Sequence, residues 1–253
     1  MKITPAFFVR LVILVLLIAF LLRPALFASL LQPLTENGAP AIYIQNSLLS
    51  LAVSHLEIVF IASGAASVVA VGCAILVTRP TGAEFLPLSR LIANIGQAFP
   101  PVAALALAVP VLGFGAAPTL LALFLYGLLP IFENALAGLT TLPTAVIDAA
   151  DGMGMTALQR LLRIELPLAL PVILGGIRLS VVIGIATATI GSTVAARTLG
   201  EVIIAGLLSN NLAFVVQGGL VVSALSVLIF DFMSFVEAYV SRGVHTRMEQ
   251  RHE

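Results

Sequence analysis

Six long apolar segments dominate this sequence and restrict what it can fold into. A helix needs about 20 apolar residues to cross the roughly 30 Å hydrocarbon core of a bilayer. The segments that suit this length are 7–28, 48–77, 91–112, 118–137, 171–193 and 214–239. Only 9% of the 253 residues are charged, whereas a soluble domain carries about 25%. The sequence therefore predicts an all-α, polytopic membrane helical bundle of about six transmembrane helices in a single domain, 1–253.

The first apolar segment, 7–28, has two interpretations. Arg10 and Arg23 bracket a run of twelve apolar residues, a length that also suits the apolar part of a secretory signal peptide. No small-residue cleavage site follows, and both arginines can reach the membrane surface from a longer, tilted helix. We expect a retained helix at the periphery of the bundle.

Positive charges are distributed unevenly between the predicted loops. If the N-terminus is cytoplasmic, the outer pieces hold only Arg23 and Arg197. The cytoplasmic pieces then hold Lys2, Arg10, Arg79, Arg90, Arg160, Arg163, Arg242, Arg247 and Arg251. Cytoplasmic loops of membrane proteins carry the excess of Lys and Arg. We therefore expect a multi-pass protein with both termini in the cytoplasm.

Composition disfavours several classes of function. Cys73 is the only cysteine and lies in an apolar run, which excludes a disulfide framework and argues against a metal cluster. The zero net charge argues against a nucleic-acid partner. No spacing of histidine, serine or carboxylate residues indicates an enzyme. Lys2 is the only lysine, so the phosphate-binding G-x-x-x-x-G-K-[ST] loop is absent. We expect no bound cofactor here, and any ATP must bind to another chain.

The longest predicted cytoplasmic loop, 140–170, has a helical pattern. Gly152 and Gly154 separate two short apolar stretches, and Thr156 and Gln159 match a capping box. Pro167 is expected to end the second helix, because the residue before proline disfavours helical angles. Such a helix could enter a groove on a soluble partner, or it could rest on the lipid headgroups.

This loop resembles the EAA loop of binding-protein-dependent ABC importer permeases. The family pattern is E-A-A, three residues, Gly, nine residues, then I-x-L-P; here Asp replaces the first Glu, and every spacing fits. The resemblance implies a type I ABC importer permease fold and a coupling helix that docks on a separate ATPase. The implied coupling residues are Asp148, Ala149, Ala150, Gly152, Gly154, Thr156, Gln159, Ile164, Leu166 and Pro167.

A narrower resemblance covers the core, 45–240. The stretches LYGLLPI, MGMTALQ and LPLALPVILGGIR are similar to those of permeases that import glycine betaine, choline, carnitine or related quaternary ammonium osmoprotectants. This implies a bacterial inner-membrane protein that works with ATPase subunits, a second permease copy or paralogue, and a periplasmic or lipid-anchored substrate-binding protein. The family's glycine-rich turn is replaced here by A-A-R-T-L-G from Ala195, which should stiffen the turn.

Acidic residues and prolines in the apolar segments are candidates for a solute pathway. Glu57, Glu133 and Asp231 are costly at membrane depth, although Glu133 could instead pair with Arg90 or Arg178. Pro100 and Pro101 should break the third segment; broken helices often line a pathway, but such a break can equally be a packing kink. An alternative function is an ion-coupled secondary transporter that uses Glu57 or Asp231 as a proton site.

Overall fold

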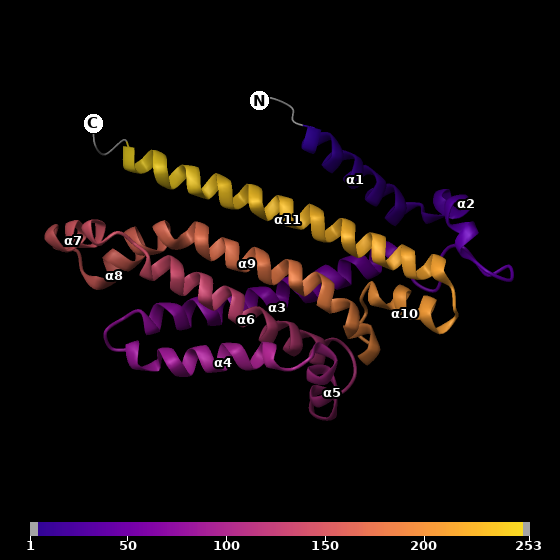
Figure 1. Cartoon of the computed structure of the whole chain (residues 1–253), viewed down its shortest axis with the longest axis horizontal. Helices are drawn as coiled ribbons and strands as arrows, with labels where there is room; N and C mark the ends of the chain where they lie inside the picture. Colours follow the sequence, from indigo (N-terminus) through magenta and orange to yellow (C-terminus); the bar gives the residue numbers. More distant parts are fainter. Residues whose placement is uncertain (1–4, 250–253) are drawn as a thin grey trace. The chain divides into compact units, whose positions relative to one another are not determined.

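The computed structural model describes residues 5–249, which form helices joined by turns and short 3₁₀ segments (Figure 1). Lys2 and Arg251, used above to predict the orientation, lie outside these residues. The α-helices are α1 Pro5–Leu22, α2 Ala28–Leu31, α3 Leu48–Val77, α4 Leu86–Ala98, α5 Pro101–Leu112, α6 Ala116–Thr140, α7 Thr144–Gly152, α8 Ala157–Arg160, α9 Leu166–Ala188, α10 Gly200–Leu208 and α11 Leu212–Glu249.

The number of helices that could cross a membrane agrees with the sequence. Within residues 5–249, four helical runs are long and apolar enough, and two broken pairs raise the number to six if each pair is one span. The four runs are Leu48–Val77, Ala116–Thr140, Ala157–Val194 and Leu212–Arg242. The predicted all-α bundle of about six transmembrane helices is confirmed.

The chain divides into two compact units. Unit 1 consists of Met1–Ala62, Pro100–Leu123 and Val182–Phe230. Unit 2 consists of Ser63–Phe99, Phe124–Val181 and Asp231–Glu253. Helices α3, α6, α9 and α11 each contribute residues to both units. The single domain expected from the sequence stays a prediction.

The first apolar segment is shorter than the predicted helix. Helix α1 ends at Leu22, not at residue 28, because Arg23 precedes Pro24 and has the non-helical angles φ −138° and ψ 63°. The 3₁₀ and helical turns that follow, Pro24–Leu34, are bent by 112° from Phe7–Leu22. The proline thus converts one predicted span into a broken pair.

The third segment is broken where the sequence predicted. Helix α4 ends at Ala98, Phe99 and Pro100 are extended with ψ of 139° and 143°, and α5 begins at Pro101. Proline at the first position of a helix is favourable because its missing N–H has no partner there in any case. The turn after α5 runs from Gly113 to Gly115, and both glycines have positive φ.

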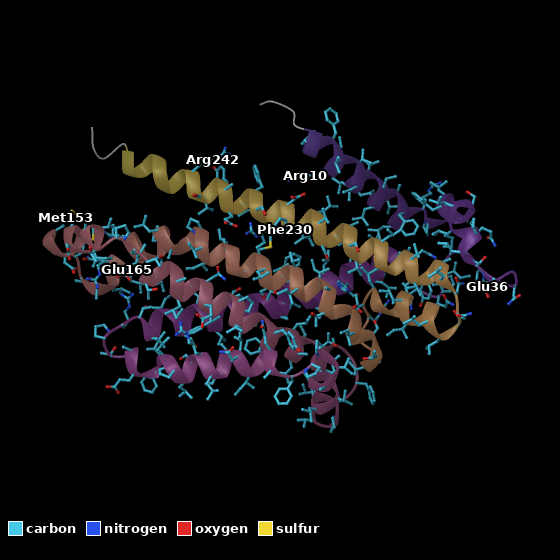
Figure 2. All side chains as sticks on the ribbon, viewed as in Figure 1. Arg10, Glu36, Met153, Glu165, Phe230 and Arg242 are labelled. Carbon is cyan, nitrogen blue, oxygen red and sulfur yellow. The ribbon has the colours of Figure 1, made fainter. Side chains whose placement is uncertain are left out.

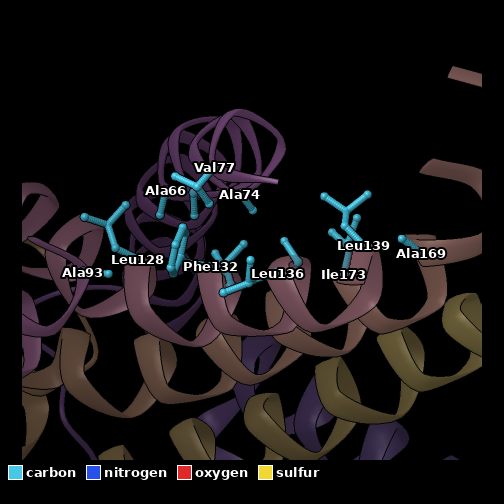
Figure 3. Close-up of a cluster of buried hydrophobic side chains, with 13 residues drawn as sticks. Ala66, Ala74, Val77, Ala93, Leu128, Phe132, Leu136, Leu139, Ala169 and Ile173 are labelled. Atoms are coloured by element: carbon cyan, nitrogen blue, oxygen red, sulfur yellow. The ribbon is translucent and has the colours of Figure 1, made fainter. Parts of the chain in front are cut away.

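The core of unit 2 is built on small residues of α3. Ala66, Ala70 and Ala74 recur every fourth residue and are buried, which allows close approach of a neighbouring helix. Figure 3 shows Leu128, Phe132 and Leu136 of α6 in the same cluster, together with Ile173 of α9. This packing holds together the helices that flank the 140–170 loop.

Candidate functional site

The first half of the 140–170 loop is helix α7. Pro143 precedes it with extended angles, φ −60° and ψ 130°. Asp148 and Ala149 are exposed on α7, whereas Ala150 is buried. The E-A-A part of the motif therefore combines an outward polar residue with a buried alanine.

Gly154 closes α7 in a left-handed conformation, with φ of 73°. Its N–H donates to the Asp151 carbonyl at 2.9 Å, and the Met155 N–H donates to the Ala150 carbonyl at 3.2 Å. This pair of bonds is the Schellman motif, in which glycine is favoured because it has no Cβ. The predicted glycine turn is therefore explained by one residue, Gly154, while Gly152 is the last residue of α7.

The predicted capping box begins helix α8. The Gln159 N–H donates to Thr156 Oγ1 at 3.3 Å, and the Thr156 N–H donates to Gln159 Oε1 at 2.9 Å. Together these bonds satisfy two backbone donors, one at Thr156 and one in the first turn of α8. The two residues thus have a structural role at the start of α8.

The expected helix end at Pro167 is wrong. After α8 the chain continues through a π-helical segment, Leu161–Glu165, directly into α9, and Pro167 is the second residue of α9. Proline in a helix removes one N–H and crowds the carbonyl four residues earlier. A π-helical segment stands just before Pro167, and its bonds run to the fifth residue, as from the Leu166 N–H to the Leu161 carbonyl. Ile164 and Leu166 flank Glu165 and are half-buried.

Glu165 binds two arginines and is the main feature that the sequence did not reveal. Arg79 Nη2 lies 2.5 Å from Glu165 Oε2, and Arg160 Nε lies 2.9 Å from Glu165 Oε1. Arg160 Nη1 also lies 2.6 Å from Asp151 Oδ1. Glu165 occupies the undefined position of I-x-L-P, and Arg79 is 86 residues away. The local signal for this network in the sequence is the spacing of Glu165 five positions after Arg160.

Three large apolar side chains are exposed on the same loop. Met153, Leu158 and Leu162 are 63%, 64% and 56% exposed, and Leu158 and Leu162 are one turn apart in sequence. Figure 2 shows Met153 at the turn after α7 and Glu165 beside α8. Clustered exposed apolar side chains indicate a surface that binds another molecule.

The pathway candidates have different surroundings. Glu133 pairs with Arg90, with Oε1 2.8 Å from Nε, as one of the two interpretations expected. Glu57 is exposed on α3 in unit 1, and Asp231 is half-buried on α11 in unit 2. Pro100 and Pro101 lie at the break between α4 and α5. Among residues 5–249, no group of three or more His, Cys, Asp or Glu side chains is arranged to hold a metal ion.

Unit 1 contains a buried histidine that has a structural role. The Leu199 N–H donates to His55 Nδ1 at 3.3 Å, so the ring proton is on Nε2, which donates to the Ile185 carbonyl at 2.9 Å. These two bonds require the neutral ring. His55 therefore joins α3 to α9 and to the turn before α10, which the sequence did not indicate.

A second polar cluster in unit 1 surrounds Glu201. Tyr43 Oη donates to Glu201 Oε1 at 2.6 Å, and the Asn46 side chain donates to the same oxygen. Burial and the neighbouring Glu201 carboxylate raise the pKa of Tyr43 to about 12. The phenol thus stays protonated at physiological pH and holds the 35–47 segment against α10.

Comparison with known proteins assigns the chain. Residues 70–245 match the family described as the inner membrane component of binding-protein-dependent transport systems. The chain belongs to this family. It is an ABC importer permease, and the resemblance based on the loop is confirmed at the level of the family.

Named relatives of the permease cover most of its length. The osmoprotectant import permease protein OsmY of Salmonella typhimurium is 41% identical over 187 residues, which are 74% of this chain and 79% of that protein. The carnitine transport permease protein OpuCD of Listeria monocytogenes is 37% identical over 166 residues, 63% of this chain and 74% of that protein.

Solved structures confirm the fold of the permease. A chain of the MetNI methionine ABC transporter, in an inward-facing conformation, aligns with a TM-score of 0.69 and 21% identity, covering 76% of this chain and 95% of that one. A chain of an amino acid ABC transporter aligns with a TM-score of 0.63 and 14% identity, covering 76% and 92%. The expected type I importer fold is therefore present.

Proposed function

We propose that the permease imports glycine betaine or a related quaternary ammonium osmoprotectant. The support is the naming of its relatives as osmoprotectant, carnitine or choline permeases at 32–41% identity. High-affinity selection would belong to a periplasmic or lipid-anchored substrate-binding protein, because aromatic cages suit quaternary ammonium groups and the chain has no Trp and three Tyr.

The α7–α8 loop is the proposed contact with a separate ATPase. The observation that carries this assignment is its geometry: a glycine turn and a capping box present Met153, Leu158 and Leu162 outward. A rigid helix that shows apolar side chains fits a groove on a soluble protein. Twofold symmetry of a pair of ATPases would require a second permease, either the same chain or a paralogue.

The proposed orientation places both termini in the cytoplasm of a bacterial cell. The loop after α3 contains Arg79, α8 ends at Arg160, and the π-helical segment contains Arg163; all three arginines belong to unit 2. The turns after α5 and α10 belong to unit 1 and have no positive residue, whereas the segments after α1 and α9, also in unit 1, have one each, Arg23 and Arg197. This sorting is the one that the positive-inside rule favours.

Uptake of radiolabelled glycine betaine into proteoliposomes tests the proposed function. The complete complex, with its ATPase and binding protein, should import the solute only when ATP is supplied to the ATPase side. Import should persist when an uncoupler collapses the proton gradient, because the energy comes from ATP. Uptake that stops with the uncoupler at constant ATP would contradict this proposal and would favour a proton site at Glu57 or Asp231, for which the comparisons offer no support.

A further inference from the structure

We propose that Arg79 and Glu165 form a mechanical link that carries movement of the α7–α8 loop to the end of α3. The two residues would act as positioning residues for import, without touching solute or nucleotide. This inference rests on the proposed coupling function of the loop. It adds a second connection to the covalent one, which runs from α8 through the π-helical segment into α9.

The first step of the argument is the geometry around the Glu165 carboxylate. Arg79 binds both of its oxygens, with Nη1 3.1 Å from Oε1 and Nη2 2.5 Å from Oε2. Arg160, the last residue of α8, also binds Oε1, through Nε at 2.9 Å. A guanidinium that binds a carboxylate through two parallel bonds fixes its orientation as well as its distance. A displacement of Glu165 would therefore pull on Arg79 through both bonds.

The second step is the continuity of the network. Asp151, in the last turn of α7, accepts from Arg160 Nη1 with both oxygens at 2.6 Å. Arg160 is the last residue of α8, and Arg79 lies two residues beyond the end of α3. The contacts Asp151–Arg160–Glu165–Arg79 thus join α7, α8, the π-helical segment and α3 within unit 2. A partner that displaces α7 or α8 would pull on α3 through this network.

The third step is that stability alone is a weak explanation for these charges. The Glu165 side chain is 4% exposed, and those of Arg79 and Arg160 are 21% and 22% exposed. Removing such groups from water costs much of what their attraction returns, and apolar replacement of a buried pair is often neutral or stabilising. The carboxylate also lies in a π-helical segment, a rare geometry that is frequent at functional sites. A mechanical link needs a fixed geometry, and this need accounts for both the buried charges and the π-helical segment.

The test replaces both charges of the link at once, with Arg79→Met and Glu165→Leu in one chain. The reconstituted complex is supplied with ATP, binding protein and radiolabelled glycine betaine, and both ATP hydrolysis and import are measured. We expect the variant to insert and to retain its ATPase, whereas the amount of solute imported per ATP falls about tenfold, a typical size for coupling between sites. An unchanged ratio in a variant that inserts normally would overturn the link.

A matched control uses the ion pair between Arg178 and Glu237, whose Nη1 and Oε2 lie 2.7 Å apart and whose side chains are 25% and 28% exposed. Arg178→Met with Glu237→Leu removes an ion pair of unit 2 whose carboxylate is more exposed than Glu165 and which does not include the loop. Its import per ATP should equal that of the wild type. An equal fall in both double variants would show a general effect of losing an ion pair and would also overturn the link.

A conservative variant covers the case in which the double variant does not insert. Arg79→Lys keeps the charge but loses the planar fork that binds both oxygens. It should insert at the wild-type level and still lower the import per ATP severalfold; a wild-type ratio would contradict the link. Failure of the wild-type complex to import with ATP would instead refute the proposed function, so the two failures are distinguishable.

Discussion

Ala195 has a backbone conformation that favours glycine. Its φ of 63° and ψ of 21° lie in the left-handed region, at the end of the 3₁₀ segment Thr189–Val194. A residue with a Cβ pays roughly 1–2 kcal/mol there, because the Cβ approaches the following carbonyl oxygen. Ala195 is thus a strained alanine in this turn; that the turn is stiffer than a glycine-rich one stays a prediction.

Ala195→Gly should therefore stabilise the permease. Relief of the strain exceeds the entropy of about 0.5–1 kcal/mol that glycine loses on folding, which leaves a net gain of about 0.5 kcal/mol. The midpoint of thermal unfolding in detergent measures it. Ala196→Gly is the matched control, since Ala196 is buried without a positive φ, and it should lower the midpoint. Equal destabilisation by both variants would contradict the assigned strain.

At the scale of a single element, Gly154→Arg tests whether the α7–α8 turn docks on an ATPase. Gly154 has a φ of +73° and open space around it, so an arginine fits sterically at the cost of backbone strain. A charge buried without a partner at an interface should weaken binding at least about tenfold, which corresponds to about 1.4 kcal/mol. Co-purification of the ATPase with the tagged permease is the measurement.

Gly38→Arg is the control for that backbone strain. Gly38 has a φ of +72° and is equally open, but it lies between α2 and α3 and not in the coupling loop. This variant should retain the ATPase and insert at the level of Gly154→Arg. If Gly154→Arg inserts and still binds the ATPase normally, the docking role of the turn is wrong.

The elements of the coupling loop show what sequence patterns can predict. The capping box at Thr156 and the turn at Gly154 depend on residues within five positions of each other, so local chemistry identifies them. Pro100 likewise ends a helix through the backbone of its own neighbours. Pro24 does the same, but the predicted span 7–28 overlooked it. Pro167 does not end a helix; the π-helical segment Leu161–Glu165 leads into α9 just before it, and no local pattern signals that segment.

At the scale of the whole molecule, the sequence predicts the membrane spans but not the contacts between distant residues. A span needs about 20 apolar residues to cross the bilayer, so the six apolar segments can be recognised by their length alone. The pairing of Glu165 with Arg79, and of His55 with the Leu199 and Ile185 backbones, joins residues that are 86 to 144 positions apart. Such partners have no periodic signature, so the structure was needed to find the network on which the proposed link depends.

The orientation of the whole molecule can be tested because the chain has one cysteine. Cys73→Ala should be tolerated, since Cys73 is only partly buried and a free cysteine acts as a small apolar residue. In that background, Glu36→Cys and Glu84→Cys each replace an exposed glutamate in a loop. Because the charge bias places 35–47 outside and 78–85 inside, a membrane-impermeant maleimide should label Glu36→Cys in intact cells and Glu84→Cys only after lysis.

Detection by mass shift is sufficient, and the Cys73→Ala parent controls for labelling of other proteins. The reverse pattern would place the α7–α8 loop outside the cell, where no ATPase could reach it, and would refute the coupling role together with the orientation.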